Sequence, residues 1–580
     1  MRGVSIRYGD VAVEAKENFM PSASESKFDT LSQLQQYNLS FTNYANPCEM
    51  YQTVLDGSAE PFPSDSANVG LWSVQLSDGN GAFDKPITLE LESEGQYSSQ
   101  GLTLTFDTNN GIHPTRLAIK WMRVTDEGIE TLSEKEYEPN NAFYFCRNFV
   151  ENYNKVVITF YSINMPYNRF KLRAIDYGYG TFFHGDELRS VKVIQEVNPL
   201  SSEISINTTD FTLDSKTDME YSFQAKQPLS TYFNGRLIST TFVKDSKRKS
   251  KQLWEVKSED YIGLLDSIPY LGGIYTDANA ADVLRDIFAV AKVPYSIDEK
   301  FEDSTITGHI PYGSCRDALM QVAFAIQAIV DTSNSDVVKV FVLDDEIKQV
   351  IHLDRIMQGQ NFNETNTVTG IEVSVHTYTP REYVEDNFVM AYDANDSGTG
   401  ENIFVLFSEP LYGVYPINDC ELIEWGANYA IINAPSKSSR LAGCSYDHTT
   451  QTRRKNNPTV LVSELENIVA VTNATLVSPN NVSTILDKCY DWLTRVRTTN
   501  LKIAERKQVE YGDYIKYGEK KYGTFKYGEK YPDVITYDEP VNIADNITAE
   551  TEYLGNVTGR IIKQSFSLNG NIVIKEAVMK

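Results

Sequence analysis

The chain has 580 residues and a net charge of −26, from 53 Lys and Arg against 79 Asp and Glu. A chain of this length divides into several domains, about three to five, since single cores rarely grow past about 250 to 300 residues. The acidic balance argues against a dedicated nucleic-acid binder and against an anionic membrane surface as a partner.

No apolar run approaches the roughly 20 residues of a membrane span, and the N-terminal MRGVSIRYGDVAVEAKENF lacks a signal-peptide core. We therefore expect a soluble chain with no membrane span and no export signal. The six cysteines have no CxxC spacing, which is typical of free thiols in a reducing cytoplasm. They are Cys48, Cys146, Cys315, Cys420, Cys444 and Cys489.

Aromatic and β-branched residues dominate many short segments that are broken by Asn, Gly and Asp. The chain contains 35 Tyr and 27 Phe, and such segments favour strands over helices. The predicted fold class is therefore mainly β with a few packing helices, a β-rich α+β class.

From about residue 46 to 180, one predicted strand follows another. Leu102, Leu104 and Phe106 alternate with Thr103 and Thr105, which is the period of a strand with one buried face. This pattern predicts a β-sandwich of jelly-roll type within roughly 130 residues.

The predicted sandwich contains residues of the types that bind sugars or cations. Sugar recognition uses an aromatic face and planar polar groups near loop tips, and the candidates by type are Trp72, Asp78, Asn80 and Arg169. For Trp72 we favour a core position over an exposed one. The segment SDGNGAFD, with Asp78, Asn80 and Asp84, superficially resembles a calcium loop, but the EF-hand glutamate is missing and no flanking helices are predicted. We interpret it as a surface turn, and a calcium site is the alternative. We predict no metal site and no cofactor.

A hairpin turn is predicted at Asn234-Gly235, between STYF and RLISTTFV. The basic segment KDSKRKSK at 244–251 separates the next two strands. It lacks interleaved aromatic residues, so we interpret it as a charged hairpin tip and not as a nucleic-acid patch.

Three segments have helical periodicity, and each has an apolar stripe suited to packing. The first runs from Asn279 to about Val293 and ends before Pro294. The second follows Ser314, which forms a capping pair with Asp317. The third lies near 480–497.

The glycine pair in LGGIYTDANAADV precedes the first of these helices, as in many phosphate-binding turns. The segment has neither the spaced glycines of a dinucleotide turn nor the Gly-Lys-Ser/Thr of a phosphate loop. We predict a tight reversal of the chain, with Asp277 or Asn279 capping the helix.

No catalytic motif is present. The six histidines include no HExxH or His-x-His pair for zinc, and the chain has no GxSxG nucleophile elbow. They are His113, His184, His309, His352, His376 and His448. Four Tyr-Gly pairs between 511 and 530 are spaced too closely for glucan-binding repeats, so we expect a Tyr-decorated loop or edge ribbon there. We predict no catalytic residues and no enzyme.

Two parts of the chain resemble known families. Residues 46–180 resemble galactose-binding-like, discoidin-type sandwiches of tail proteins from phages that infect Firmicutes, on Trp72 with LSD, SSQGLTLTFD, VENYNKVVITF and PYNRFKLRAIDYG. Residues 185–580 resemble the tail or baseplate hub family of phages, prophages and phage-derived particles. The segments that carry this second resemblance are NPLSSEISINTTDFTLD, YFNGRLISTTFV, LWEVKSEDYIGLLD, LGGIYTDANAADVLRDIFAVAKVPYSID, TGHIPYGSCRDALMQVAFAIQAIVDTS, NATLVSPNNVSTILDKCYDWL and YLGNVTGRIIKQSFSLNGNIVIKE.

The hub resemblance implies a domain order. It implies an N-terminal strand or arm of the hub at 1–45, the galactose-binding-like β-sandwich at 46–180 and a first hub β-barrel at 181–270. A helix-containing α/β hub domain at 271–350 and a second hub β-barrel region at 351–580 follow, the latter with the helix near 480–497 and C-terminal strands.

The resemblance also implies partners and a place in the particle. It implies a homotrimer whose paired barrels face a hexameric tail tube or distal tail protein, next to a tail-tip spike or tape measure protein and other baseplate proteins. DNA would pass only in transit, and the sandwich would contact host cell-wall glycan. The location is the virion, at the tail tip or baseplate, after assembly in the host bacterial cytoplasm. The alternatives are a carbohydrate-active or carbohydrate-binding enzyme of a cell surface and a receptor-binding tail fibre protein.

Overall fold

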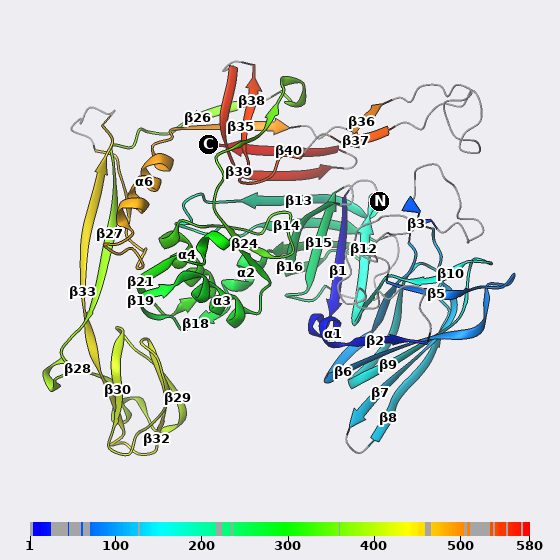
Figure 1. Cartoon of the computed structure of the whole chain (residues 1–580), viewed down its shortest axis with the longest axis horizontal. Helices are drawn as coiled ribbons and strands as arrows, with labels where there is room; N and C mark the ends of the chain where they lie inside the picture. The colour runs from blue at the N-terminus through cyan, green and yellow to red at the C-terminus, as the bar shows by residue number, and fades with distance from the viewer. Residues whose placement is uncertain are drawn as a thin grey trace.

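The computed structural model describes residues 4–24, 44–45, 60–61, 70–108, 110–125, 128–215, 223–233, 236–358, 360–458, 466–503, 507–510, 534–537, 540–552, 555–569 and 572–580. Most of these residues form strands, arranged in several sheets with helices packed between them (Figure 1). This confirms the predicted β-rich class.

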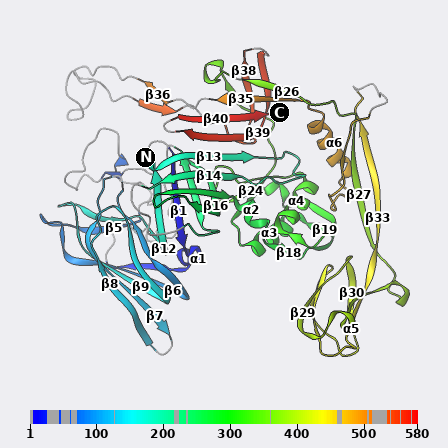
Figure 2. The same ribbon diagram turned by 180° about the vertical axis from the view of Figure 1, so that it is seen from behind.

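The largest sheet has 13 strands and runs through the middle and the top of the molecule (Figure 2). Its first part has its own core, which includes Tyr8, Phe211 and Trp254, and its C-terminal part packs around Leu501 and Ile561. Strands β13 and β39 pair from Ser190↔Asn569 to Glu196↔Lys563 and so join the two parts in one sheet.

The order of the strands in this central sheet is β12-β1-β15-β16-β17-β14-β13-β39-β40-β35-β26, and β38 pairs with both β39 and β25. In chain order the strands are β1 (Val4–Val11), β12 (Gly178–His184), β13 (Leu188–Glu196), β14 (Thr208–Asp214), β15 (Pro228–Phe233), β16 (Arg236–Arg248), β17 (Leu253–Glu259), β25 (Ile347–Ile351), β26 (Asn361–Glu364), β35 (Arg497–Ile503), β38 (Asn546–Thr551), β39 (Gly555–Asn569) and β40 (Ile572–Met579).

Both predicted hairpins of this sheet are present. Phe233 pairs with Arg236 at the end of the β15–β16 ladder, although the turn residues 234–235 lie outside the described residues. Strands β16 and β17 are antiparallel, but the basic segment 244–251 does not separate them as predicted: its residues up to Arg248 belong to β16, and only 249–252 form the turn. Acidic residues of β17 pair with the basic segment, including Glu255 at 3.1 Å from Lys249.

The sandwich lies beside the central sheet, at the lower right of Figure 1. A six-stranded sheet packs against a two-stranded one around a core that includes Phe106, Trp121, Phe160 and Phe170. The larger sheet contains β2 (Met20–Ala23), β6 (Ala82–Thr105), β7 (Pro114–Thr125), β8 (Gly128–Tyr137), β9 (Phe143–Ile163) and β11 (Ala174–Asp176), and the smaller one β5 (Leu71–Leu76) and β10 (Arg169–Leu172).

The N-terminal segment joins the sandwich to the central sheet. After β1, helix α1 (Val13–Asn18) leads into β2, which pairs with β6. The buried carboxylate of Asp176 forms ion pairs with Arg7 of β1 and, at 3.5 Å, with Lys16 of α1. Burial alone would raise the pKa of Asp176, but the charges of Arg7 and Lys16 outweigh burial and hold this pKa below its usual value.

An α/β part lies below the central sheet. Its helices α2 (Tyr261–Leu265), α3 (Ala280–Ala291) and α4 (Cys315–Ile326) share one core. The small sheets around them are formed by β18 (Pro269–Tyr270), β19 (Gly273–Asn279), β20 (Tyr295–Ile297), β21 (Thr305–Ile310), β22 (Gly313–Ser314), β23 (Ile329–Asp331) and β24 (Val338–Phe341).

The three predicted helices are confirmed as α3, α4 and α6 (Val482–Leu493). The side chain of Asn279 caps α3 by accepting from the backbone N–H of Asp282 at 3.0 Å. Ser314 and Asp317 form a complete capping box at the start of α4. These helices begin where the sequence predicted because side chains within one turn fix each start.

A feature that the sequence did not predict is a long two-stranded ribbon of β27 (Gly370–Pro380) and β33 (Arg440–Asn456), with β34 (Ile468–Val471) beside β27. Helix α6 packs on it. The ribbon carries a small lobe at its far end, at the lower left of Figure 1. This distal lobe contains β28 (Phe388–Asp393), α5 (Ala394–Ser397), β29 (Gly400–Leu406), β30 (Leu411–Ile417), β31 (Glu421–Trp425) and β32 (Tyr429–Ala434).

Two short pairs complete the described strands: β3 (Tyr44–Ala45) with β4 (Glu60–Pro61), and β36 (Lys507–Glu510) with β37 (Val534–Tyr537). The Tyr-Gly segment 511–530 and Cys48 lie outside the described residues. The other five cysteines are buried free thiols. Within the described ranges, no helix has the length and apolar character needed to cross a membrane.

The ion triad at the sandwich joint gives the first prediction. Replacing Asp176 with Ala removes the carboxylate that Arg7 and Lys16 share in a buried position, and we expect a loss of about 3 to 5 kcal/mol in the stability of this joint. Urea unfolding followed by tryptophan fluorescence would measure it. The control is Glu136→Ala, which breaks an exposed pair with Arg116 and should change the unfolding curve little. Equal curves for both variants would contradict the expectation.

Candidate functional site

The sugar candidates Trp72 and Arg169 lie inside the sandwich and not at a loop tip. Trp72 is only 2% exposed. The ammonium of Lys171 lies 4.3 Å from the centre of its ring and 3.3 Å from the carboxylate of Asp107. The guanidinium of Arg169 is also buried and donates to the carbonyl of Ser73 at 2.9 Å. Both side chains therefore hold the β5–β10 pair, and Trp72 occupies the core position that we favoured for it.

Asp78 and Asn80 lie on an exposed turn after β5. One carboxylate oxygen of Asp78 accepts from the backbone N–H of Asn80 and of Ala82, at 2.8 Å each, so it closes the turn. Asp84 is exposed on β6. In the described part of the chain, no three His, Cys, Asp or Glu residues are grouped so that they could hold a metal ion.

Tyr167 is an aromatic residue at this turn that the sequence analysis missed. It is 42% exposed and adopts a left-handed backbone conformation, with φ of 57°. Its hydroxyl would lie 2.8 Å from a Cβ atom at Gly79, so the glycine leaves room for the phenol over the turn. A sugar could therefore meet Tyr167, Asp78 and Asn80 on one exposed surface. The unusual feature of Tyr167 is its positive φ, which few non-glycine residues adopt. Backbone angles cannot be read from the sequence, so nothing there pointed to this residue.

The glycine pair at 272–273 is structural. Gly272 has φ of 64°, and a Cβ atom there would lie 2.2 Å from the carbonyl oxygen of Ile310. Strand β19 then pairs with β21, and α3 begins only after Asn279. The pair therefore allows the close approach of two chain segments, where we predicted a tight reversal, and it does not open onto the N-terminus of α3.

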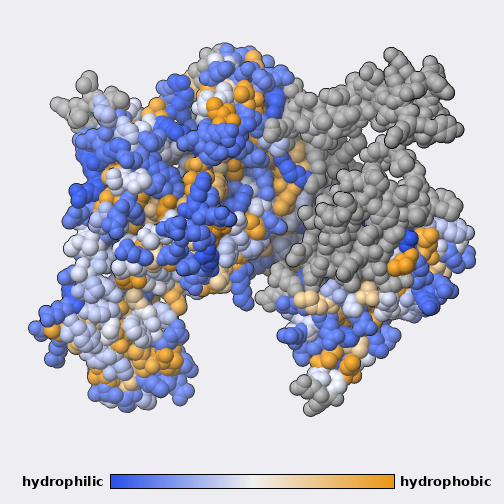
Figure 3. Space-filling model, in the orientation of Figure 1, coloured by the Kyte–Doolittle hydropathy of each residue, from blue (hydrophilic) through white to orange (hydrophobic). Residues whose placement is uncertain are grey.

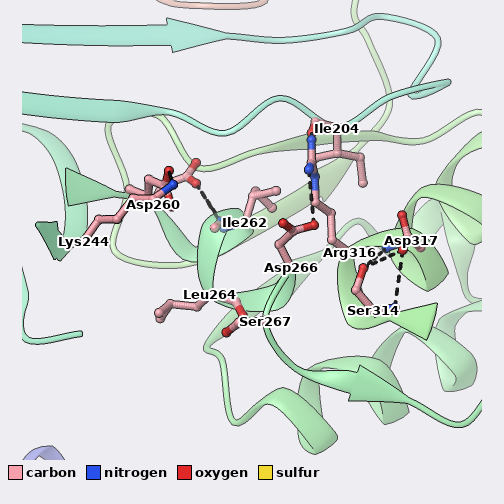
Figure 4. A network of polar contacts seen from close by, with 12 residues as sticks. Ile204, Lys244, Asp260, Ile262, Leu264, Asp266, Ser267, Ser314, Arg316 and Asp317 are labelled. Carbon is pink, nitrogen blue, oxygen red and sulfur yellow. Dashed lines mark hydrogen bonds and ion pairs between the residues drawn. The ribbon is translucent and has the colours of Figure 1, made fainter. Parts of the chain in front are cut away.

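The segment before this pair connects the central sheet to the α/β part. Asp260 follows β17 and is 1% exposed (Figure 4). Its Oδ1 accepts from the backbone N–H of Ile262 at 3.1 Å and of Gly263 at 3.3 Å, and its Oδ2 accepts from the hydroxyl of Thr332 at 2.5 Å. Burial raises the pKa of Asp260 to about 7, although these hydrogen bonds act in the opposite direction.

Arg316 makes a second connection in the same region. Its guanidinium donates to the carbonyl of Ile204 from Nε at 3.0 Å and contacts the carboxylate of Asp266 from Nη1 at 3.3 Å (Figure 4). Ser314 and Asp317 fix the start of the helix that carries it. Together, Asp260 and Arg316 hold α2 and α4 against the segment between β13 and β14.

The central sheet ends differently on its two sides. Thr103 of the sandwich covers β12, because its hydroxyl donates to the carbonyl of Gly178 and accepts from the N–H of Gly180, at 2.8 Å each. This side chain replaces the ladder bonds that an edge strand lacks. It also explains why Thr103, on the opposite face from Leu102, is buried.

At its other end the strand order stops at β26, while β25 lies off this order, paired with β38. Residues 347–358 and 360–364 carry both strands, and we call them the apolar rim. β25 pairs with β38, Ile356 bridges to Ile503 of β35, and β26 pairs with β35. In the described residues, β25 and β26 each pair on one side only. Five apolar side chains of the rim are 44 to 49% exposed: Ile347, Val350, Leu353, Met357 and Phe362. Figure 3 shows hydrophobic surface at the top of the molecule, where β26 and β38 lie in Figure 1.

An edge strand with exposed apolar side chains is a surface that pairs with another chain. The sequence analysis missed this rim because its residues become a row only when β38 and β35 bind its two ends. His309, His376 and His448 were missed for a similar reason. They lie near one another only because β21, β27 and β33 meet in the fold.

No family model and no curated protein matches the chain. Among solved structures, a tail protein from Neisseria meningitidis MC58 is 9% identical, with a TM-score of 0.38, over 68% of this chain and 92% of that one. A 43 kDa tail protein of prophage MuSo2 from Shewanella oneidensis is 6% identical, with a TM-score of 0.39, over 69% and 95%. The family 32 carbohydrate-binding module of NanJ from C. perfringens, solved with galactose, matches 30% of this chain and 99% of its own at 11% identity, with a TM-score of 0.19. The similar structures thus include tail proteins, at TM-scores too low to assign a function.

Asp260 gives the second prediction. The folded chain binds the Asp260 proton more tightly than an unfolded chain, in which an aspartate has a pKa of about 3.9. Stability should therefore fall as pH rises from about 4 to about 7, by up to about 1.4 kcal/mol per pH unit. Asp260→Asn, which stays neutral and keeps the cap oxygen, should remove this part of the pH dependence. Thermal unfolding between pH 5 and pH 8 measures it.

The matched control is Asp266→Asn, which neutralises a half-exposed partner of Arg316 a few residues away. It should keep the pH profile of the wild-type chain. A profile of Asp260→Asn that runs parallel to the wild-type profile would show that the Asp260 carboxyl is ionised throughout.

Proposed function

We propose that this chain is a structural hub subunit of a phage tail or baseplate. In this proposal three copies form a ring that joins the tail tube to the tail tip and lets DNA or the tape measure protein pass. Two features support it: the ordered resemblance of residues 185–580 to the hub family, and a central sheet whose one end is covered and whose other end is the apolar rim.

The apolar rim is the observation that carries the proposal. One copy leaves the backbone edges of β25 and β26 and five apolar side chains in contact with water. Pairing with a neighbouring copy would satisfy the edges and bury the side chains, and each buried side chain contributes favourably to association. A closed ring is one arrangement in which every copy covers the rim of the next.

The net charge of −26 is compatible with passage of DNA. A trimer carries three times this charge, and like-charge repulsion from acidic side chains along a bore would keep DNA from binding to its wall. The partners in this proposal are a hexameric tail tube or distal tail protein, a tail-tip spike or tape measure protein and other baseplate proteins. The assembly site is the host bacterial cytoplasm, and a Firmicute host belongs to the same proposal.

A second function is favoured by one observation in the sandwich. Asp78 and Asn80 of the turn at 78–81 are exposed, and the exposed ring of Tyr167 lies over this turn. An aromatic face and polar groups therefore meet solvent side by side. We propose that this turn contacts host cell-wall glycan while the ring holds the sandwich. The same turn would serve the alternatives, a carbohydrate-binding enzyme of a cell surface or a receptor-binding tail fibre protein, and a trimer would exclude a monomeric enzyme.

The third prediction tests the ring. Multi-angle light scattering of the wild-type chain should give three times the 65.5 kDa of one copy. Val350→Asp places a charge on the apolar rim, and we expect the trimer to dissociate at least about tenfold more readily, because an unpaired charge would be desolvated in the contact. Ile129→Asp is the control, since Ile129 is an exposed apolar residue on the edge strand β8 of the sandwich. A wild-type monomer, or equal dissociation of both variants, would reject the ring.

The fourth prediction tests the glycan contact. Tyr167→Ala should weaken binding of the full chain to Firmicute wall polysaccharide by roughly 2- to 10-fold, the contribution of one aromatic face. A glycan array and titration calorimetry would measure it. Tyr312→Ala, which removes a similarly exposed tyrosine of the α/β part, is the control. If both variants bind the polysaccharide as tightly as the wild-type chain does, the sugar site does not lie at this turn.

A further inference from the structure

Three histidines far apart in the sequence meet where the β27–β33 ribbon passes the α/β part. Nδ1 of His376 on β27 lies 2.9 Å from Nε2 of His448 on β33, and the ring centres are 5.2 Å apart. Tyr378 stacks on His448, with centres 4.4 Å apart and planes within 1° of parallel. His309 of β21 meets Tyr378 at an angle, with centres 5.5 Å apart. The four rings therefore connect the ribbon to the α/β part.

Asn428 extends this contact to the distal lobe. Nε2 of His309 lies 2.7 Å from Oδ1 of Asn428, and Nδ2 of Asn428 donates to the carbonyls of Leu271 at 2.8 Å and Ile310 at 2.9 Å. Because Nδ2 must be the donor to two carbonyls, Oδ1 is the acceptor and His309 donates from Nε2. The backbone carbonyl of Asn428 in turn accepts a hydrogen bond from the backbone N–H of Phe407 in the lobe, at 2.8 Å. One buried asparagine thus fastens the distal lobe to the α/β part.

The groups packed around the three rings are neutral. On the ribbon these are the phenol of Tyr378 and the hydroxyl of Thr450, 3.4 Å from Nε2 of His448. On the α/β side, the hydroxyl of Thr475 is bound to the carbonyl of His309 and lies 3.3 Å from the amide oxygen of Gln321 on α4.

The nearest ion pair, Asp447 with Arg381 at 2.8 Å, lies on the opposite face of the ribbon, since successive residues of a strand alternate. Within the described residues, His448 is the only charge that acts on the other two histidines. None of these described neighbours of the rings is a carboxylate, so none would balance the positive charge of a protonated ring.

We propose that His309, His376 and His448 form a proton-sensitive latch, which holds the distal lobe against the α/β part while the rings are neutral and releases it when they are protonated. A hydrogen bond between two histidines needs one ring nitrogen with a lone pair. When both rings are protonated, two N–H groups face each other across the 2.9 Å contact, and two positive charges repel at close range. The latch goes beyond the proposed hub function and does not depend on it.

The direction of the pH effect follows from burial. Burial, and next the charge of His448, lower the pKa of His376. Burial also lowers the pKa of His309, against the effect of its bond to Asn428. A histidine in an open state has a pKa of about 6.5, so the closed state is fully stable above that pH and loses stability as pH falls below it. Release is therefore expected below about pH 6.5.

The test is hydrogen–deuterium exchange of the full chain at pH 7.5 and pH 5.5, with rates corrected for the intrinsic effect of pH. Peptides covering 305–312 and 424–430 should exchange faster at pH 5.5, by up to about tenfold for each histidine that is protonated only in the open state, because pH 5.5 lies about one unit below the open-state pKa. Peptides from β9, in the core of the sandwich, should keep their protection and so exclude general acid unfolding. Equal corrected rates at both pH values would overturn the latch, and this measurement needs no variant.

A double variant, His376→Gln with His448→Gln, removes the titrating pair. Its exchange at 305–312 and 424–430 should respond less to pH than that of the wild-type chain, because only His309 of the three rings still titrates there. His184→Gln, an exposed histidine of β12 outside the cluster, is the matched control and should keep the wild-type response. A double variant that retains the wild-type pH response would also overturn the latch.

Discussion

The hydrogen-bonding groups at a sheet edge must find partners, and this requirement organises the molecule. The 13-stranded sheet has one end at β12, where Thr103 of the sandwich supplies a donor and an acceptor to Gly178 and Gly180. Along the chain, β1 of this sheet is followed by α1 and then by β2, which pairs with β6 of the sandwich. This connection holds the sandwich against the sheet. The apolar rim at the other end has no such cover within the described residues. One copy is thus complete at one end and suited to a partner at the other.

Buried polar contacts join the parts of the molecule. Arg7, Lys16 and Asp176 connect the sheet to the sandwich, Asp260 connects it to the α/β part, and Asn428 connects the α/β part to the distal lobe. Such contacts tolerate few alternative geometries, because each unpaired group would remain desolvated. They also respond to protons, which purely apolar contacts do not. The joints therefore set the orientation of the parts and make it sensitive to the surroundings.

The sequence predicted those features that depend on neighbours along the chain. The β-rich class, the helices α3, α4 and α6, the caps at Asn279 and Ser314 and the β15–β16 hairpin follow from periodicity and turn chemistry within a few residues. The burial of Trp72 and Arg169 depends on the register between β5 and β10. Residue type alone favoured the core for Trp72 but gave no such signal for Arg169. The ribbon, the apolar rim and the histidine cluster need pairing across tens to hundreds of residues, for example His376 opposite Thr450. Local patterns contain no signal for such pairing.

The position of the distal lobe on the ribbon has an evolutionary consequence. The last ribbon pair joins Pro380 to Tyr446, so the chain leaves and re-enters the ribbon at adjacent points. An insertion with neighbouring ends can grow, shrink or be exchanged without shifting the register of the strands that carry it. Related chains could therefore carry unrelated cassettes at this site and acquire a new surface by recombination, while the strands of the ribbon stayed the same.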